Sequence, residues 1–388
     1  MYWITCLEGG PQRVNHAAAS VENKIFSFGG YNSDEAFDIG HKIDIHVFDT
    51  SCLRWRPVHY TNVNAAPMKC YGHTVVSHGY KIYQWGGRNN LCASNTLYCF
   101  NTKSYAWNIV PTSGIIPHKV DGHSACVING FMYVFGGYEE ETEMFSNSVH
   151  RLNLKSFEWE KVPTKGQPPS CRDFHTASVI NDKMYIFGGR YIESEMETYN
   201  NEIVFLDTKS MKWDKPLCGG KLPCGRRSHS AVVYHNEIYI TGGFNGHTKY
   251  HLNDIYKFNP EKRMWYEMHP KGEPPCPRRR HCSCVIGDHM FLFGGSSPLN
   301  EDEYARHYSN DTQENRTLQD HSDLYILDFF PTLQRLCQLE VIKSNLRIEL
   351  LPQPLIREIY VLTTNSKMLK SFYTRYPRND YLGIATSA

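Results

Sequence analysis

Six histidines recur along this chain, each thirteen residues before the first glycine of a Gly-Gly pair. They are His16, His73, His123, His175, His229 and His281. Imidazoles gathered into a ring could ligate a metal ion or act as general bases. A side chain that occupies one register of every repeat belongs to the scaffold, however. We therefore expect a structural role for all six, in which each ring hydrogen-bonds the backbone of its turn.

A second arrangement of possible metal ligands is the segment His281–Cys284, which combines an imidazole with two thiols. Both groups are zinc ligands. The two cysteines occupy the strand positions that Ser124 and Cys126 hold in an earlier repeat, which is typical of a buried strand. The sequence predicts no bound metal, no other cofactor and no catalytic residue.

Composition narrows the classes of partner and the compartment. The chain has 388 residues and a net charge of +1, so no overall field favours nucleic acid or a membrane surface. It contains no run of about 18 apolar residues that could span a membrane. The segment Met1–Cys6 lacks the basic and apolar regions of a secretion signal. With thirteen cysteines, an odd number, we expect reduced thiols and a location in cytoplasm and nucleus.

The Gly-Gly pairs recur at intervals of 50 to 57 residues, a period that indicates one supersecondary unit repeated in space. They are Gly29-Gly30, Gly86-Gly87, Gly136-Gly137, Gly188-Gly189, Gly242-Gly243 and Gly294-Gly295. In the unit 119–166, four short strand-like segments alternate with turns, and Asn129-Gly130 is a two-residue hairpin signal. Four antiparallel strands are the composition of one β-propeller blade.

This repeated signature resembles the kelch repeat, and all six copies match it. The resemblance implies an all-β, six-bladed propeller, which we expect to span residues 1–328. The sixth repeat ends after Leu324–Leu327 without a tryptophan strand. Trp3 precedes Gly10 by seven residues, as Trp107 precedes Gly114. We therefore expect the N-terminal strand to complete the sixth blade and leave no open edge.

The composition changes after residue 328. In the segment 329–366, apolar residues from Leu333 to Ile342 have helical spacing, and Leu351-Pro352 opens a second helix. A two-helix appendage with more apolar residues than it can bury alone is expected to dock a partner. The alternative is that it packs back on the propeller. The polar segment 367–388 is expected to be a flexible tail.

Two motifs in this appendage resemble those of ubiquitin-ligase receptors. Thr332, Leu333, Cys337 and Val341 match the spacing of a BC box, which binds elongin. Leu351, Pro352, Leu355 and Ile359 look like a cullin-2 box. Both boxes in order after a kelch propeller resemble the kelch-repeat substrate receptors of cullin-2 RING ubiquitin ligases. The resemblance implies elongin B, elongin C and cullin-2 with its RING subunit as partners.

In a kelch propeller, the loops after the Gly-Gly pairs and before the histidines lie on one face, around the central opening. The residues after the pairs are Tyr31, Arg88, Tyr138, Arg190, Phe244 and Ser296. The arginines three residues before the histidines are Arg13, Arg172, Arg226 and Arg278. Arginines and aromatic side chains that converge on one opening are typical of a carboxylate site.

The ligase resemblance implies the ligand, namely protein C-termini that end in glycine. Arginine and hydroxyl donors hold the free carboxylate, in a pocket too small for a Cβ. The residues expected to bind it are Arg88, Tyr138, Arg172, Arg190, Arg226, Arg227 and Ser228. Some relatives carry a second arginine a few residues after the Arg190 position, whereas here the loop 191–197 is acidic. We expect Arg227 to replace that arginine, and the loop to favour basic residues before the glycine.

These features predict a non-catalytic substrate-recognition subunit that directs bound proteins to ubiquitination and proteasomal degradation. An enzyme with copper or iron would need a convergent ligand set away from the scaffold register, and the sequence contains none. The remaining alternative is a kelch scaffold associated with chromatin or the cytoskeleton. The run Arg278–Arg280 is compatible with chromatin association. The two helical boxes favour the ligase interpretation.

Overall fold

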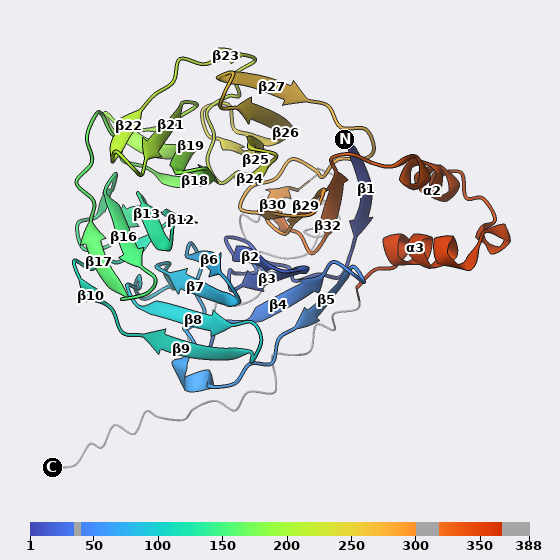
Figure 1. Ribbon diagram of the computed structural model, residues 1–388, viewed down its shortest axis with the longest axis horizontal. Helices are drawn as coiled ribbons and strands as arrows, with labels where there is room; N and C mark the ends of the chain where they lie inside the picture. Colours follow the sequence, from blue (N-terminus) through green and yellow to red (C-terminus); the bar gives the residue numbers. More distant parts are fainter. Residues whose placement is uncertain (35–39, 300–317, 367–388) are drawn as a thin grey trace, which may run out of the picture.

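The computed structural model describes residues 1–34, 40–299 and 318–366. Within these ranges, six sheets of four or five strands are arranged as blades around a central axis (Figure 1). The six-bladed, nearly all-β propeller predicted from the repeats is confirmed. The predicted tail, 367–388, lies outside the described residues.

In each blade the innermost strand lies at the axis, and the strands named after it lie progressively further out. Blade one comprises β2 (Ala17–Val21), β3 (Lys24–Phe28), β4 (Ile45–Asp49) and β5 (Arg54–Pro57). Blade two comprises β6 (Thr74–His78), β7 (Lys81–Trp85), β8 (Leu97–Asn101) and β9 (Ala106–Val110). Blade three comprises β12 (Ser124–Ile128), β13 (Phe131–Phe135), β16 (Val149–Asn153), β17 (Glu158–Lys161) and β10 (Ser113–Gly114). Blade four comprises β18 (Asp173–Ile180), β19 (Lys183–Glu193), β21 (Ile203–Asp207) and β22 (Lys212–Asp214). Blade five comprises β24 (Ser230–Tyr234), β25 (Glu237–Asn245), β26 (Tyr250–Asn259), β27 (Met264–Met268) and β23 (Gly219–Gly220). Blade six comprises β28 (Cys282–Ile286), β29 (His289–Phe293), β32 (Leu324–Asp328) and β1 (Tyr2–Leu7).

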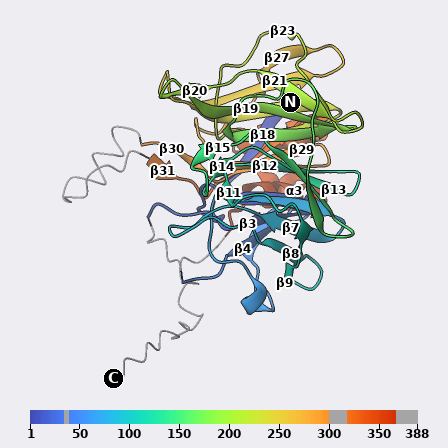
Figure 2. The ribbon, with the colours of Figure 1, turned by 90° about the vertical axis from the view of Figure 1, so that its left-hand side faces the viewer.

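Short strands extend from several blades on one side of the propeller (Figure 2). They are β11 (Val120–Asp121), β14 (Tyr138–Glu139), β15 (Met144–Phe145), β20 (Met196–Tyr199), β30 (Ser296–Pro298) and β31 (Leu318–Asp320). A 3-10 turn, η1 (Val63–Ala65), connects blades one and two. These extensions raise the wall around the central opening on that side.

The N-terminal strand closes the ring, as the tryptophan spacing predicted. β1 pairs antiparallel with β32, and Trp3 lies opposite Leu327. The N–H of Trp3 also donates to the carbonyl oxygen of Lys271 over 2.8 Å, which links blade six to the segment that leaves blade five. A Cβ on Gly272 would lie 2.4 Å from the carbonyl oxygen of Trp3, so a glycine is required beside this contact.

A ring of six backbone hydrogen bonds closes the propeller at its axis. In each blade, the residue before the histidine donates its N–H to the carbonyl of the equivalent residue in the preceding blade, over 2.7–3.2 Å. These waist residues are Asn15, Gly72, Gly122, Phe174, Ser228 and Arg280. All have φ between 51° and 68°, a left-handed conformation that costs a non-glycine residue about 1–2 kcal/mol. The two bonds at each residue hold the strained backbone in place.

The Gly-Gly pairs join each blade to the next. The N–H of the second glycine donates to the carbonyl oxygen of the residue three positions before the next histidine. Gly137, for example, donates to the carbonyl of Arg172 over 2.8 Å. The first glycine lies against that histidine, so a Cβ at Gly86 would be 2.4 Å from Cε1 of His123. Both glycines of every pair have φ between 55° and 101°. A side chain on the first glycine would therefore push the next blade away, whereas one on the second would collide with its own blade, as a Cβ at Gly87 would lie 2.5 Å from that of His73.

The six recurring histidines, here called the scaffold histidines, fill the space between blades. In four of them, Nε2 hydrogen-bonds a hydroxyl of the preceding blade, a contact that the sequence did not predict. The pairs are His123 with Thr74 (2.8 Å), His175 with Ser124 (2.7 Å), His229 with Thr176 (2.9 Å) and His281 with Ser230 (2.9 Å). Burial lowers the pKa of His16, His123 and His281 to about 3 and that of His73 to about 4. The rings are therefore neutral and structural at pH 7.

Two helices follow the last blade and project from the edge of the propeller (Figure 1). They are α2 (Leu333–Lys343) and α3 (Gln353–Thr363), connected through the 3-10 turn η2 (Ile348–Leu350). Thr332 caps α2, because its side chain accepts a hydrogen bond from the N–H of Arg335 over 3.1 Å. Pro352 is the N-cap of α3, and Pro354 lies in its first turn, where the fixed φ of proline suits a helix.

This appendage is fastened to the propeller at both ends. At its start, the ring of Phe329 stacks on that of Tyr234 in blade five, with centroids 4.0 Å apart. At its end, the Thr5 hydroxyl donates to the carbonyl of Leu362 over 2.7 Å, and Leu362 is buried in the core of blades one and six. Packing against the propeller, which the sequence left as an alternative, is thus observed for part of the appendage.

The scaffold histidines predict that the fold is sensitive to acid. Their pKa values in the folded protein lie well below the ordinary value near 6.5, so unfolding takes up protons as the pH falls. Their contribution to stability is complete above pH 6.5 and is lost toward pH 4. At pH 5 the expected loss is about 2 kcal/mol per histidine. Urea denaturation at pH 7.5, 6 and 5 measures this loss.

A matched pair of variants isolates one histidine. His123→Gln keeps a partner for Thr74 and should reduce the proton uptake on unfolding by about one. His269→Gln, the same substitution at an exposed position, is the matched control. A free energy of unfolding that is constant between pH 5 and 7.5 would contradict the neutral, buried state of these rings.

Candidate functional site

A cavity of 1320 Å³ is lined in part by the short strands that extend from the blades, among them β14 and β15 with Tyr138, Met144 and Phe145. Its walls come from the loops after the Gly-Gly pairs and before the scaffold histidines. Of the predicted site residues, Arg88, Tyr138 and Arg190 line it. Beneath it, a narrower space of 110 Å³ at the waist is surrounded by the six scaffold histidines and all six waist residues, including Ser228.

Two of the predicted arginines are already balanced by carboxylates. Arg190 donates from Nε and Nη2 to Asp173 over 2.9 and 3.1 Å, and from Nη1 to Glu197 over 2.6 Å. Arg88 lies 3.9 Å from Asp121. Burial raises the pKa of Asp121 and of Asp173 to about 6, so both are mostly ionised at neutral pH. These arginines therefore present little free positive charge.

Three other arginines, Arg227, Arg279 and Arg280, are not neutralised in this way by a described carboxylate. We call them the arginine cluster. The Nε atom of each is buried without a hydrogen-bond partner. Among the described residues, no carboxylate forms an ion pair with them. Burial lowers the pKa of Arg279 to about 10, and repulsion from Arg280 and Arg227 adds to the effect. The Phe244 ring lies 4.7 Å from Arg279 and 5.3 Å from Arg227, and Tyr31 accepts from Arg280 over 2.5 Å.

Arg280 lies where the cavity narrows, because it lines both the cavity and the waist, while Arg227 and Arg279 pack on the Phe244 ring. The hydroxyl of Ser228 is also buried there without a partner. Desolvated guanidinium groups beside an unpaired hydroxyl complement a carboxylate, which accepts several charge-assisted hydrogen bonds. This arrangement can bind an anion; it contains no nucleophile activated by a base.

Sequence reasoning located Arg227 and Ser228 but missed Arg279 and Arg280. The signal that could have found them is their position relative to the scaffold histidine. Arg279 and Arg280 occupy, before His281, the two positions that Arg227 and Ser228 occupy before their own histidine. The sequence indicated a basic cluster, whereas Arg278 is buried, Arg280 lines the cavity and Arg279 is half-buried against Phe244.

The structure corrects the prediction that Arg172 and Arg226 bind the ligand. Both are fully buried. Nη1 of each donates to the first glycine of its own blade's pair, to the carbonyl of Gly188 over 2.9 Å and of Gly242 over 3.1 Å. Arg226 also forms two hydrogen bonds with Asp254, at 2.5 and 2.9 Å. These arginines connect turn and strand, so they belong to the scaffold.

Known proteins share this architecture. Residues 72–295 match the family described as KLHDC2/KLHL20/DRC7 Kelch-repeats domain, and residues 12–58 match the Kelch motif. The chain is 43% identical over 378 residues to kelch domain-containing protein 3 of Rattus norvegicus and of Homo sapiens, covering 94% of this chain and 97% of each relative. It is 31% identical over 267 residues to host cell factor 2 of Homo sapiens, covering 64% of this chain and 33% of that protein. The chain belongs to the kelch-repeat family.

Kelch-repeat propellers of this family are typically non-catalytic scaffolds or receptors. The blades end at Asp328 and cannot account for 94% of the chain, so the similarity to kelch domain-containing protein 3 includes part of the appendage. Within the described ranges, no helix has the length and hydropathy needed to cross a membrane.

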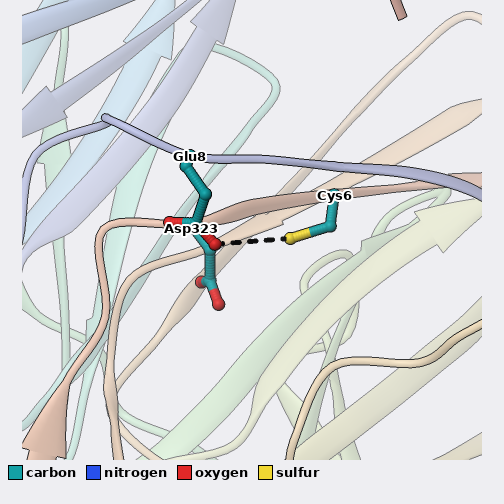
Figure 3. A group of neighbouring side chains, drawn as sticks. All are labelled: Cys6, Glu8 and Asp323. Atoms are coloured by element: carbon teal, nitrogen blue, oxygen red, sulfur yellow. Dashed lines mark hydrogen bonds between the residues drawn. The ribbon is translucent and has the colours of Figure 1, made fainter. Parts of the chain in front are cut away.

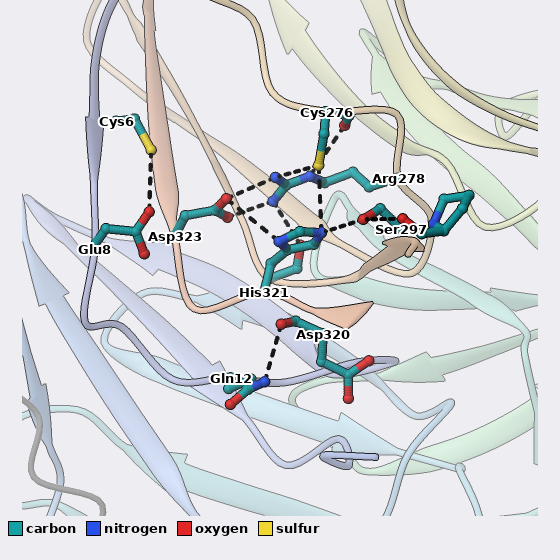
Figure 4. A network of polar contacts seen from close by, with 11 residues as sticks. Cys6, Glu8, Gln12, Cys276, Arg278, Ser297, Asp320, His321 and Asp323 are labelled. Carbon is teal, nitrogen blue, oxygen red and sulfur yellow. Dashed lines mark hydrogen bonds and ion pairs between the residues drawn. The ribbon is translucent and has the colours of Figure 1, made fainter. Parts of the chain in front are cut away.

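One group in the described part of this kelch propeller resembles a metal site. Ligand atoms of Cys6, Glu8 and Asp323 lie within 4.8 Å of one another (Figure 3). Both oxygens of Asp323 accept hydrogen bonds from Arg278, over 2.5 and 2.8 Å, and His321 lies beside the same pair (Figure 4). A guanidinium in contact with the carboxylate disfavours a second cation, so the geometry is that of a structural ion pair.

Cys282 and Cys284 lie in β28, at the strand positions that the sequence indicated. The Cys282 thiol donates a hydrogen bond to the carbonyl oxygen of His16 over 3.3 Å. Cys284 is buried in the core shared by blades one and six. Both cysteines therefore help to join the first and last kelch blades.

The BC-box residues predicted on the kelch appendage differ in exposure. Leu333 is 77% exposed, and Cys337, one turn further along α2, is exposed as well. Val341 is half-buried, and Thr332 caps the helix. Leu333 and Cys337 thus form an apolar stripe that faces solvent.

The predicted cullin-box residues are less accessible. Leu351 and Leu355 are half-buried and Pro352 is exposed. Ile359 is buried, which corrects the prediction that it contacts a cullin. Its position inside the appendage shows that it holds α3 in place.

Arg278 and Arg279 are neighbours with opposite roles, so they form a matched test. Arg278→Gln breaks a buried ion pair and leaves Asp323 uncompensated, which should lower the free energy of unfolding by about 3 kcal/mol. Arg279→Gln removes a positive charge that Arg280 and Arg227 repel. It should leave the free energy of unfolding unchanged or raise it by less than about 1 kcal/mol. Urea denaturation at pH 7.5 compares them. Equal losses would mean that the arginine cluster is a structural element.

Proposed function

We propose that this protein is the non-catalytic substrate-recognition subunit of a cullin-2 RING ubiquitin ligase. In this role the propeller binds protein C-termini that end in glycine. The appendage recruits elongin B, elongin C and cullin-2 with its RING subunit, and the bound protein is ubiquitinated and degraded by the proteasome in cytoplasm and nucleus. The observation that carries the proposal is the arginine cluster: among the described residues no carboxylate forms an ion pair with its three guanidinium groups, and Arg280 lies where the cavity narrows.

A terminal carboxylate suits this position better than an internal acidic side chain. The space at the waist is small, and Gly72 and Gly122 contribute only backbone to its wall. An internal aspartate or glutamate would bring the chain on both of its sides into the cavity, whereas a C-terminus brings the chain from one side only. A final glycine, which has no Cβ, brings its carboxylate closest to the floor.

The donors around that position match a carboxylate in number and kind. Arg227 and Arg279 offer unpaired Nε–H groups, and Ser228 offers a hydroxyl. Each charge-assisted hydrogen bond of this type contributes about 1.5–3 kcal/mol in a desolvated site. Arg190 and Tyr138 line the wall along which the preceding residues of the ligand would pass.

The appendage supplies the second half of the proposal. Leu333 and Cys337 form an exposed stripe on a helix that is held against the propeller at both ends of the appendage. An apolar stripe on a fixed helix suits insertion into a groove of an adaptor protein. A chromatin scaffold gains little support from Arg278–Arg280, because Arg278 is buried in an ion pair with Asp323 and Arg280 lines the cavity.

Recognition of the carboxylate can be measured with short peptides that end in glycine. Arg279→Gln should weaken binding of the free acid at least tenfold, because a charge-assisted hydrogen bond is lost, in line with about 1.5–3 kcal/mol. Amidation of the peptide should have a similar effect on the parent protein. Arg56→Gln, at an exposed position on β5, is the control and should bind normally. Equal affinity for acid and amide, measured by fluorescence polarisation, would exclude recognition of a C-terminus.

Adaptor recruitment depends on a different surface. Leu333→Asp combined with Cys337→Asp should reduce elongin C binding by more than about thirtyfold, given hot-spot losses of about 2 kcal/mol each. The melting temperature of the propeller should not change, because both side chains face solvent. Leu217→Asp alters a residue that is 91% exposed on the propeller and should leave elongin binding intact. Elongin capture that survives the double substitution would refute the docking role of α2.

A further inference from the structure

The cavity has an apolar wall across the central opening from the sixth blade. Met144 in β15 of blade three and Ile192 in β19 of blade four both line it, and they are 65% and 56% exposed. Arg280 lines the same cavity from blade six, which faces blade three in a ring of six. Apolar side chains exposed on a cavity wall mark a surface that a ligand can cover.

The size of the cavity relates this wall to the arginine cluster. A volume of 1320 Å³ corresponds to a width of about 11 Å, the span of about three extended residues at roughly 3.3–3.6 Å each. A chain whose carboxylate lies at the cluster therefore keeps about three residues within the cavity. The side chain about four residues from its end then reaches Met144 and Ile192.

We infer that Met144 and Ile192 form a second subsite, which binds an apolar side chain about four residues before the terminal carboxylate of the bound protein. This inference rests on the proposed function. The occupant is the C-terminal segment of the substrate, because the apolar wall and the cluster belong to one cavity and a single chain can span both.

The chemistry of the wall sets what the subsite accepts. A methionine side chain is flexible and polarizable, so it adapts to apolar groups of different shape. Glu143 and Glu193 line the same wall. They repel an acidic side chain at this position of the ligand. The subsite therefore ranks an aliphatic residue above a small polar one, and a small polar residue above an acidic one.

Eight-residue peptides with a free C-terminal glycine test this ranking on the full chain. Leucine, serine or aspartate is placed at each position from the third to the sixth from the end, and affinity is measured by fluorescence polarisation. At one position near the fourth, leucine should bind about tenfold tighter than serine, and aspartate more weakly than serine. Met144→Ser combined with Ile192→Ser should abolish the leucine preference without changing the melting temperature.

Met196→Ser is the matched control. Met196 is 67% exposed on β20 of the same hairpin as Ile192 and is not among the residues that line the cavity, so the leucine preference should persist. Affinities within twofold at all four positions, or a preference that survives the double substitution, would overturn the subsite. Amidated peptides distinguish failure of the subsite from failure of the proposed function. Equal binding of amide and acid would mean that the cavity contains no carboxylate site.

Discussion

Six blades must approach one another closely enough at the axis for their backbones to form a closed ring of hydrogen bonds. This requirement forces the waist residues into a left-handed conformation. It also explains the Gly-Gly pairs, which leave room for the histidine of the next blade. Because the backbone at the waist has the same conformation in every blade, it cannot by itself distinguish one ligand from another. Differences between blades lie in the side chains beside the waist and in the short strands that extend from some blades.

The arginines near the axis fall into two classes according to their distance from the histidine. Arg172, Arg226 and Arg278, three residues before it, run back into their own blade, where a glycine carbonyl and, for Arg226 and Arg278, a carboxylate receive them. Arg13, at the same position, bonds Asp44 instead. Arg227, Arg279 and Arg280, one or two residues before it, form no ion pair with a described carboxylate, and Arg280 lines the cavity. Burying charge without a partner destabilises a fold, so such a cluster is retained where a ligand supplies the counter-charge. In the proposed function that ligand is a chain terminus.

The appendage connects this site to the rest of the proposed ligase. Its start is held by the stack of Phe329 on Tyr234 in blade five, and its end by hydrogen bonds to blades six and one. A helix pair fixed at both ends cannot swing freely about the propeller. The exposed stripe on α2 therefore has a defined direction relative to the cavity, which a receptor needs in order to present a bound protein to the same place each time.

The sequence by itself determined the propeller, the number of blades and the closing strand, because each follows from local spacing repeated along the chain. The separation of Trp3 from Gly10 was enough to assign the N-terminal strand to blade six. It also placed Arg227 and Ser228 at the turn before His229, and their role in ligand binding stays a prediction. Only the tertiary structure decided which arginines are free, since the carboxylates that neutralise Arg226 and Arg278 lie 28 and 45 residues away in the chain. The burial of Ile359 was equally hidden from the sequence, because a helical pattern shows which residues share a face but not which face meets another element.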